Sequence, residues 1–576
     1  MRFLPLLFLL LVFRGHAQYT HVWTGAQDNQ WNNMNNWQPA TVPTTSSKVK
    51  IDTYVNCPVV LASSVEVADF YLLNTALNLQ AHTLKSDTLR IYFSELTANN
   101  GKISSQEMRV FVGNTVLGDL QFETQNGQFQ AGNRFQNAVQ ITLNACATCA
   151  GFVMYAPNVF NGQVRLTNKG QGFTVSAYSG TVTFNKKMTL INAATADVTS
   201  QYFGQKDYLN VRGNVVFEDS VVVIDSSSNR NSRVWFTDVR FNAPTLLNTK
   251  GSTVYVGMKA AEINSSLQLQ SNGGAFELGT TTSGQAVFTT SGRLQLRRGD
   301  CSGTRLAWNN CKYLNNGALE IDMSSTDTTQ LSNEFITSDS AYIAADLTVL
   351  SPLIQLDGGM FNGKATFNRT KSFYFPQMCA GGNVFADSLT IMNASGSPWF
   401  WGATRNDVFG KAVRAVHSAK NTNELYLAQA GSTTFKANLT LQSTPNANAG
   451  GIFVGFGADS VRFDNNAKIM IDDFGAGTAG LFNVRQRGTT VHNRFTLHGN
   501  GILRIENSTF AGVLAASSPQ LYLNNSVFLQ PVVFVKTANG LNSSVGNNTF
   551  RGRLHLVNNA TAGSLKFVFI DSTLSK

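Results

Sequence analysis

Residues 158–166 read NVFNGQVRL, and this nine-residue stretch returns along the chain in altered form. It matches GMFNGKATF at residues 359–367, NVFADSLTI at 383–391 and NTFRGRLHL at 548–556. The shared rule is a phenylalanine followed by apolar residues four and six positions later. By this rule the repeats centre on Phe135, Phe160, Phe184, Phe217, Phe361, Phe385, Phe409, Phe435, Phe463, Phe510, Phe528 and Phe550.

The spacing of these phenylalanines indicates a period near 24 residues. Phe361, Phe385 and Phe409 follow one another at intervals of 24. The interval of 144 between Phe217 and Phe361 is six times 24, and the interval of 47 between Phe463 and Phe510 is nearly twice 24. The period therefore persists where the motif itself fades, and this is typical of a repeat architecture.

The geometry of β-strands explains how such a period can form a fold. Residues at 0, +4 and +6 have the same parity, so we expect them to point to one side of a single strand. One strand cannot bury its apolar row alone, but coils stacked about 4.8 Å apart would place each phenylalanine on the next. Asn and Gly beside the phenylalanine suit tight corners, because both tolerate positive φ.

The sequence therefore predicts an all-β chain that forms a single-stranded parallel β-helix, a β-solenoid, over residues 53–576 with coils of roughly 24 residues. Right-handed coils are expected, because parallel crossovers are overwhelmingly right-handed. The alternative is an array of antiparallel β-sandwich domains, which would show hairpin turns every 8–12 residues and no single long period.

Composition agrees with an all-β chain of low charge. Charged residues make up 14% of the 576, Gly numbers 48, and the formal net charge is +10. Lys and Arg are scattered singly, with Lys186-Lys187 and Arg297-Arg298 among the few doublets. This pattern favours a mildly basic, solvated surface and argues against a nucleic-acid footprint. A polysaccharide or another cell-surface component is the partner we expect.

The first 17 residues have the pattern of a signal peptide. Arg2 supplies the positive charge, residues 3–13 the apolar core, and Gly15-His16-Ala17 the small residues at positions −3 and −1 of a cleavage site. We expect the mature chain to start at Gln18 and to be secreted or displayed at the cell surface. No other stretch is apolar and long enough to span a bilayer, so an integral membrane protein is not expected.

Six cysteines are too few to form a disulfide scaffold in a chain of this length. Cys301 and Cys311 are close enough in sequence for a local disulfide, which we predict. Cys146 and Cys149 have CxxC spacing without a second pair or a nearby His, so a bridge that closes a turn, or two inert thiols, is preferred over metal or redox chemistry. No phosphate loop or zinc-protease motif is present, so no cofactor or metal is expected.

Residues 18–52 differ from the repeats and contain three of the tryptophans, Trp23, Trp31 and Trp37. They precede Val42-Pro43 and the strand-like stretch at residues 49–52. We interpret this block as a cap over the open end of the solenoid core, which solenoids need to prevent edge-to-edge association.

This block resembles the W-T-G…W-N…N-W…V-P…V-x-I opening of large secreted surface proteins of the Bacteroidetes type. In those proteins it often precedes autotransporter-like or haemagglutinin-like β-helical repeats, which the phenylalanine coils also resemble. The resemblance implies adhesion or cell-surface structure. Many relatives end in a β-sandwich sorting domain, whereas this chain stops at Lys576 soon after a strand-like stretch at residues 565–570.

Catalysis has one candidate location. Asp472-Asp473, His498-Gly499 and Arg504-Ile505 loosely resemble, in their order, the Asp-Asp, Gly-His-Gly and Arg-Ile-Lys elements of polygalacturonases. In such enzymes one carboxylate protonates the leaving oxygen and another activates water. Here the Asn-Thr-Asp element is missing and Glu506 stands where a lysine belongs. We interpret Asp472, Asp473 and His498 as polar turn and surface residues, with a polysaccharide-active enzyme as the alternative.

Binding has a candidate in the aromatic segment at residues 397–401. Trp399 and Trp401 share parity, so both face outward as a platform for sugar rings or both face inward as core. Together these features predict an exported β-solenoid with a structural or adhesive role, binding a glycan or a neighbouring surface without catalysis.

Overall fold

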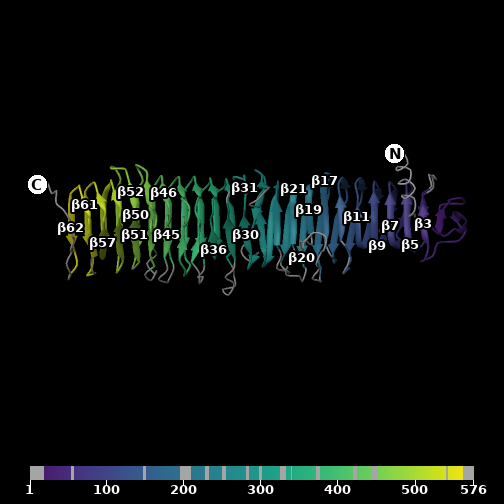
Figure 1. Cartoon of the computed structure of the whole chain (residues 1–576), viewed down its shortest axis with the longest axis horizontal. Helices are drawn as coiled ribbons and strands as arrows, with labels where there is room; N and C mark the ends of the chain where they lie inside the picture. The colour runs from purple at the N-terminus through teal and green to yellow at the C-terminus, as the bar shows by residue number, and fades with distance from the viewer. Residues whose placement is uncertain are drawn as a thin grey trace, which may run out of the picture. The chain divides into compact units, whose positions relative to one another are not determined.

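The computed structural model describes residues 19–52, 58–146, 149, 151–170, 172–194, 209–226, 233–249, 255–280, 284–296, 301–324, 333–338, 340–370, 376–418, 424–443, 450–475, 477–539 and 543–561. The predicted signal peptide lies outside them. The chain divides into unit 1, Met1–Ser252, and unit 2, Thr253–Lys576. Within each unit, the strands of successive coils pair in parallel (Figure 1), while β1 and β2 of the N-terminal block pair antiparallel. The part of the chain described here contains no helix with the length and hydropathy needed to cross a bilayer.

Unit 1 begins with a short block and continues with coils that contribute up to three strand positions each. Its elements are β1 (His21–Trp23), the 3₁₀ helix η1 (Met34–Asn36), β2 (Trp37–Gln38), β3 (Lys48–Ile51), β4 (Val59–Val60), β5 (Val65–Leu73), β6 (Ala76–Gln80), β7 (Thr83–Tyr92), β8 (Glu95–Ala98), β9 (Gly101–Val112), β10 (Thr115–Leu117), β11 (Leu120–Phe129), β12 (Asn133–Phe135), β13 (Val139–Leu143), β14 (Phe152–Tyr155), β15 (Asn158–Phe160), β16 (Val164–Asn168), β17 (Phe173–Phe184), β18 (Met188–Asn192), β19 (Leu209–Phe217), β20 (Val221–Asp225), β21 (Arg233–Phe241) and β22 (Thr245–Thr249).

In unit 2 the strands fall into three sets. An 11-stranded sheet contains β32 (Leu319–Asp322), β35 (Leu347–Ser351), β38 (Ala365–Arg369), β41 (Leu389–Asn393), β44 (Val413–His417), β47 (Leu439–Ser443), β50 (Ile469–Phe474), β53 (His492–Leu497), β56 (Val513–Ser518), β59 (Val532–Lys536) and β62 (Leu554–Asn558). An 8-stranded sheet contains β39 (Gln377–Met378), β42 (Trp399–Phe400), β45 (Leu425–Leu427), β48 (Ile452–Val454), β51 (Thr478–Phe482), β54 (Ile502–Glu506), β57 (Gln520–Asn524) and β60 (Ser543–Gly546).

The third set of unit 2 includes the strands that carry the phenylalanine position of each coil, which is filled in four of them by Ile263, Tyr313, Ile343 and Gln486. These are β24 (Glu262–Ile263), β27 (Ala286–Phe288), β31 (Cys311–Tyr313), β34 (Tyr342–Ile343), β37 (Met360–Phe361), β40 (Val384–Phe385), β43 (Val408–Phe409), β46 (Ser432–Phe435), β49 (Ser460–Phe463), β52 (Val484–Gln486), β55 (Thr509–Phe510), β58 (Val527–Phe528) and β61 (Thr549–Phe550). The earliest coils add β23 (Tyr255–Lys259), β25 (Ser266–Asn272), β26 (Ala275–Leu278), β28 (Arg293–Gln295), β29 (Cys301–Ser302), β30 (Arg305–Trp308), β33 (Glu334–Thr337) and β36 (Leu353–Gln355).

The predicted all-β parallel solenoid is confirmed, and so is the stacking of its phenylalanines. Five rings of unit 1 stack with centroids 4.5–5.2 Å apart, and five of unit 2 stack at 4.6–5.6 Å. The interval of 47 is two coils, because Gln486 pairs with Phe463 in the phenylalanine position. Its buried amide exchanges hydrogen bonds of 2.8 and 3.0 Å with Asn493. The stack members are Phe135, Phe160, Phe184, Phe217 and Phe241, and Phe361, Phe385, Phe409, Phe435 and Phe463.

Coil length is less uniform than the phenylalanines indicate. In unit 1, Val65 pairs with Leu84 and Leu84 with Ile103, so these coils are 19 residues long. Later in the same unit Leu166 pairs with Leu190, a coil of 24. The short coils hold aliphatic residues where later coils hold phenylalanine, so the phenylalanine rule does not detect them.

The expectation that the phenylalanine and the residues at +4 and +6 share one strand is wrong. Phe385 ends β40, whereas Leu389 and Ile391 belong to β41 in the 11-stranded sheet. The short connection at residues 386–388 turns the chain between two sheets, and all three apolar side chains still point into the core. A corner of three residues preserves the inward direction, so parity alone does not separate it from a continuous strand.

The polar residue two positions before the phenylalanine forms a buried ladder. In unit 1 the side-chain oxygen of Asn133 accepts the backbone N–H of Asn114 at 3.0 Å, and Asn158 accepts that of Asn133 at 2.9 Å. Positive φ lies one residue earlier, for example at Gly132, where φ is 86°, and at Asn547, where φ is 56°. The corner therefore uses two adjacent residues, one for conformation and one for hydrogen bonding.

We expect Asn133→Ala to lower the free energy of unfolding of unit 1 by about 2 kcal/mol, because it leaves buried backbone groups without partners. Asn133 also donates to the carbonyl of Gln130 at 2.7 Å and to Asn158 at 2.9 Å. Asn185→Ala is the matched control, because Asn185 donates to Asn161 on the half-exposed outer side of the coil. Urea denaturation of both variants tests this, and equal losses would contradict a special role for the inner ladder.

The N-terminal tryptophans pack together and against the first coil. Trp23 and Trp31 lie edge-on to Trp37 with centroids 4.9 and 4.7 Å away, and all three are buried. Trp31 also stacks on Phe70 of β5 at 6.4 Å, while β3 pairs in parallel with β5. The block thus places a dense aromatic cluster against the first coil of unit 1.

Candidate functional site

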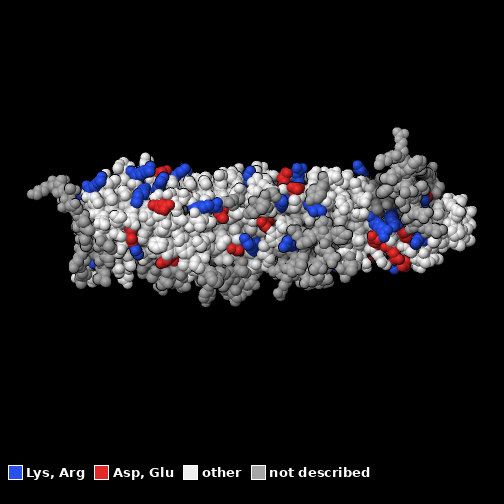
Figure 2. Space-filling view, in the orientation of Figure 1, with Lys and Arg blue, Asp and Glu red and all other residues white. Residues whose placement is uncertain are grey.

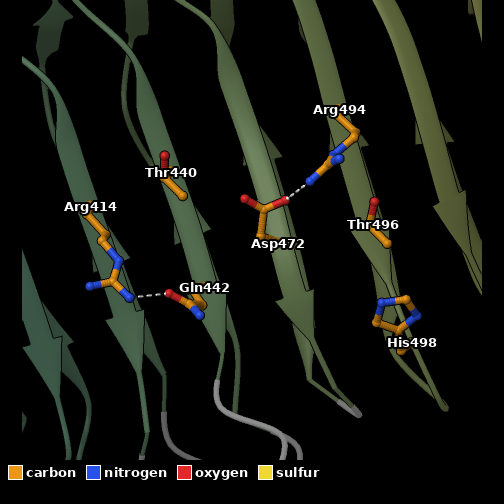
Figure 3. Close-up of a pocket in the computed structure, with 7 residues that line it drawn as sticks. All are labelled: Arg414, Thr440, Gln442, Asp472, Arg494, Thr496 and His498. Atoms are coloured by element: carbon orange, nitrogen blue, oxygen red, sulfur yellow. Dashed lines mark hydrogen bonds and ion pairs between the residues drawn. The ribbon is translucent and has the colours of Figure 1, made fainter.

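An open polar groove lies on the outer face of the 11-stranded sheet in unit 2. It crosses four consecutive coils through β44, β47, β50 and β53. Alternate residues of these strands point outward while their neighbours, such as Leu441 and Ile471, are fully buried. Register therefore brings residues from different coils side by side. The groove is lined by Arg414, Thr440, Gln442, Asp472, Arg494, Thr496 and His498 (Figure 3).

Two pairs organise the polar groups of the groove. Arg414 donates from Nη2 to Oε1 of Gln442 at 2.5 Å, and Arg494 donates from Nη2 to Oδ1 of Asp472 at 2.7 Å. Both pairs link neighbouring coils, as Figure 3 shows. With two arginines and one aspartate among its lining residues, the groove has an excess of one positive charge when His498 is neutral.

The structure brings together two of the three residues named for the enzyme alternative. Asp472 and His498 line the same groove, whereas the side chain of Asp473 lies outside the described part of the molecule. Arg504 and Glu506 belong to β54 in the 8-stranded sheet, where they form an ion pair with each other. The polygalacturonase-like order therefore does not assemble into one site.

The described groups of the groove suit binding better than glycoside hydrolysis. Hydrolysis normally uses two carboxyl groups on either side of the scissile bond. Asp472 is the one carboxylate among the described lining residues, and it is engaged by Arg494. Hydroxyl, amide, guanidinium and imidazole groups in an open groove offer hydrogen bonds to hydroxyl- or carboxylate-rich polymers.

Of the two orientations left open for Trp399 and Trp401, the inward one is correct, and the alternative of outward glycan contacts is wrong. Both side chains are 0% exposed. Trp401 packs against Phe367 at 5.8 Å and against Phe385 at 6.1 Å, inside the phenylalanine core. The residue between them, Phe400, is the one on the outer face, because successive side chains of a strand alternate.

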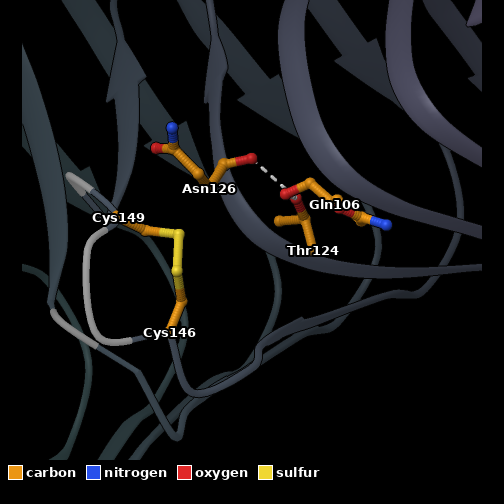
Figure 4. Close-up of a disulfide and its surroundings, with 5 residues drawn as sticks. All are labelled: Gln106, Thr124, Asn126, Cys146 and Cys149. Atoms are coloured by element: carbon orange, nitrogen blue, oxygen red, sulfur yellow. Dashed lines mark hydrogen bonds between the residues drawn. A yellow bond between two sulfur atoms is a disulfide. The ribbon is translucent and has the colours of Figure 1, made fainter.

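The cysteines whose side chains the structure describes form one disulfide and two buried free thiols. Cys146 and Cys149 form a disulfide in the connection between β13 and β14 of unit 1, near Asn126 (Figure 4). This confirms the bridge that closes a turn. The predicted Cys301–Cys311 disulfide is wrong, because Cys311 is a free thiol fully buried in the core of unit 2. Cys379 is likewise free and buried, and burial raises the pKa of its thiol to about 12.

Charge elsewhere is dispersed. Figure 2 shows Lys and Arg singly or in small groups over the visible face, with Asp and Glu among them. Among the described residues, no group of three or more His, Cys, Asp or Glu side chains is placed to hold a metal ion.

No protein-family model, curated protein or solved structure matches this chain.

Proposed function

We propose that this chain is an exported β-solenoid that acts at the cell surface as a structural or adhesive protein and binds an acidic polysaccharide through the groove of β44, β47, β50 and β53. The observation that carries the proposal is the open groove itself, which has two arginines, one aspartate and uncharged polar groups across four coils. A polymer chain can follow such a repeating surface, and carboxylates along it would meet Arg414 and Arg494.

The resemblance of the tryptophan block to Bacteroidetes-type surface proteins is part of the same proposal. The predicted signal peptide supports export, and the buried tryptophans pack against the first coil as a cap requires. The disulfide of unit 1 agrees with an oxidising compartment.

We expect the mature chain, residues 18–576, to be retained by gels containing polygalacturonate or alginate and to lose retention as salt is raised. Arg414→Gln/Arg494→Gln should weaken retention at least about fivefold, because each lost charge-assisted hydrogen bond contributes roughly 1 kcal/mol or more. Arg165→Gln/Arg462→Gln removes the same charge at exposed positions outside the groove and should change retention little. Equal losses in both double variants would show that only net charge matters.

The second candidate, a polysaccharide-active enzyme, is favoured by one observation, the convergence of Asp472 and His498 in the groove. The same incubations separate the two functions when released reducing ends are measured. Product release that Asp472→Asn abolishes would replace adhesion by catalysis. Retention without products is the result that the adhesive proposal requires.

A further inference from the structure

A column of aromatic side chains runs along the outer face of the 8-stranded sheet in unit 2. Phe400, Tyr426 and Phe453 are in register on β42, β45 and β48. The Phe400 and Tyr426 rings stack at 4.6 Å, and the Tyr426 and Phe453 rings at 5.3 Å. Phe456 extends this surface and is 46% exposed. The column lies on a different sheet from the polar groove (Figure 1).

After Phe453 the aromatic column is interrupted by two residues that are not aromatic. The next residues in register are Gly480 on β51, Arg504 on β54 and Tyr522 on β57. A Cβ at Gly480 would lie 2.4 Å from the ring of Phe453, so only glycine lets that ring lie over β51. The Arg504 guanidinium stacks 4.8 Å from the centroid of Tyr522.

Where Gly480 and Arg504 take the place of aromatic residues in this register, a cleft of about 260 Å³ lies between Phe453 and Tyr522. Binding sites for small molecules usually enclose about 300–1,000 Å³, so this cleft has room for little more than one ring. Apolar surfaces alternate with polar groups around it. The lining includes Phe453, Thr478, Ile502, Arg504, Gln520 and Tyr522.

The polar groups of the cleft are available to a ligand. The Thr478 hydroxyl, the Gln520 amide and the Tyr522 hydroxyl make no hydrogen bond to any described residue. Arg504 is the one charged side chain among the described lining residues, and its Nε is engaged in an ion pair with Glu506, which lies outside the lining. The groups of the polar groove differ, because four of them are already paired with one another.

We propose that this cleft is a subsite for one neutral pyranose ring of a polysaccharide. A pyranose has an apolar C–H face that packs on an aromatic ring and peripheral hydroxyls that need donors and acceptors at its edge. Phe453, Ile502 and Tyr522 supply the apolar surface. Thr478, Gln520 and the Nη groups of Arg504 supply the donors and acceptors for the hydroxyls. Because Glu506 already compensates the charge of Arg504, we assign an uncharged sugar to the cleft in preference to a uronate. The inference rests on the proposed polysaccharide binding but uses another sheet and another chemistry.

Affinity electrophoresis of the mature chain in gels containing a neutral β-glucan, mannan or xylan tests this subsite. We expect at least one polymer to slow the protein, and Tyr522→Ala and Gln520→Ala each to weaken its binding at least about fivefold. Tyr522→Phe should retain most of the ring contact and lose less. Tyr155→Ala, at an exposed tyrosine of β14 in unit 1, is the matched control and should bind normally.

The variants separate loss of the sugar subsite from loss of the fold. Thermal melting shows whether Tyr522→Ala still folds, and Gln520→Ala gives independent evidence because its outward amide supports no described contact. No slowing by any neutral polymer, or slowing that Tyr522→Ala and Gln520→Ala leave unchanged, would overturn the subsite. Sensitivity of acidic-polymer binding to Tyr522→Ala would show that the assigned sugar is wrong. Retention on acidic polymers that depends on Arg414 and Arg494 would leave the proposed function intact in all these cases.

Discussion

Asp407→Asn is expected to stabilise unit 2 by about 3 kcal/mol at pH 7.5, since burial of the carboxyl group raises its pKa to about 6. Asp407 is 0% exposed and occupies the inner ladder where other coils have Asn, Ser or Thr. Its Oδ1 accepts the backbone and side-chain N–H of Asn383 at 2.9 and 3.0 Å, which favours the charged form but does not offset burial. Its Oδ2 is buried without a hydrogen-bond partner.

The raised pKa of Asp407 makes its contribution to the free energy of unfolding depend on pH. The folded-state pKa lies above the ordinary value of 3.8, so the folded chain holds a proton that the unfolded chain has lost between about pH 4 and pH 6. The contribution of Asp407 to stability therefore falls as pH rises through this window and stays low above it. An amide at position 407 remains uncharged, and it can donate toward Thr433, the next residue of the ladder.

Urea denaturation at pH 4.0 and 7.5 measures this effect. We expect Asp407→Asn to gain stability at pH 7.5 and little at pH 4.0. Asp387→Asn is the matched control, because Asp387 is a half-buried residue of the corner whose pKa is lowered by the N–H of Ser388. Its substitution should have a small effect of opposite sign. A destabilised Asp407→Asn protein at neutral pH would mean that the charge is needed.

The phenylalanine repeat predicted the fold because it encodes contacts between coils. Rings such as Phe160 and Phe184 stack almost parallel, 4.9 Å apart, so their spacing in sequence follows coil length directly. The rule failed where other residues fill the same position. Gln486 replaces a ring and satisfies its amide with Asn493, and Leu77, Leu96 and Val116 fill the phenylalanine position of the 19-residue coils.

The site was only partly predictable. Asp472 and His498 were named from their local order, but Arg414 and Arg494 join them through register across loops of unequal length. A motif in one coil contains no information on that alignment. The aromatic column left a weak signal, because Phe400, Tyr426 and Phe453 recur at intervals of 26 and 27. The orientation of Trp399 and Trp401 could not be decided from the sequence, because strand parity places both on one side without saying whether that side faces the core.

Arg369→Met is expected to lower the free energy of unfolding of unit 2 by about 3–5 kcal/mol, because it removes the donors for several buried oxygens at once. Arg369 is 0% exposed in β38. Its guanidinium donates to the carbonyls of Ser397 and Pro398 at 3.0 Å each and also to the hydroxyl of Ser397. It lies 6.0 Å from the ring centroid of Trp399.

The guanidinium thus links β38 to the corner before β42, in addition to the backbone hydrogen bond that Gln377 donates to the Pro398 carbonyl. Burial lowers its pKa to about 10, so it stays charged at neutral pH, with carbonyl oxygens and no carboxylate among its hydrogen-bond partners. Methionine preserves much of the length and apolar stem but supplies no donor. Lysine offers one compact ammonium in place of the planar fork, so Arg369→Lys should recover only part of the loss.

Arg462→Met is the control, since Arg462 is exposed on β49 and its loss should change stability by less than about 0.5 kcal/mol. Chemical denaturation monitored by tryptophan fluorescence suits the comparison, because Trp399 and Trp401 are buried beside the altered site. Equal stability of Arg369→Met and Arg462→Met would show that water replaces the guanidinium at these carbonyls. A large loss confined to Arg369→Met would establish that one buried cation holds the corner that orients β42, and with it the start of the aromatic column at Phe400.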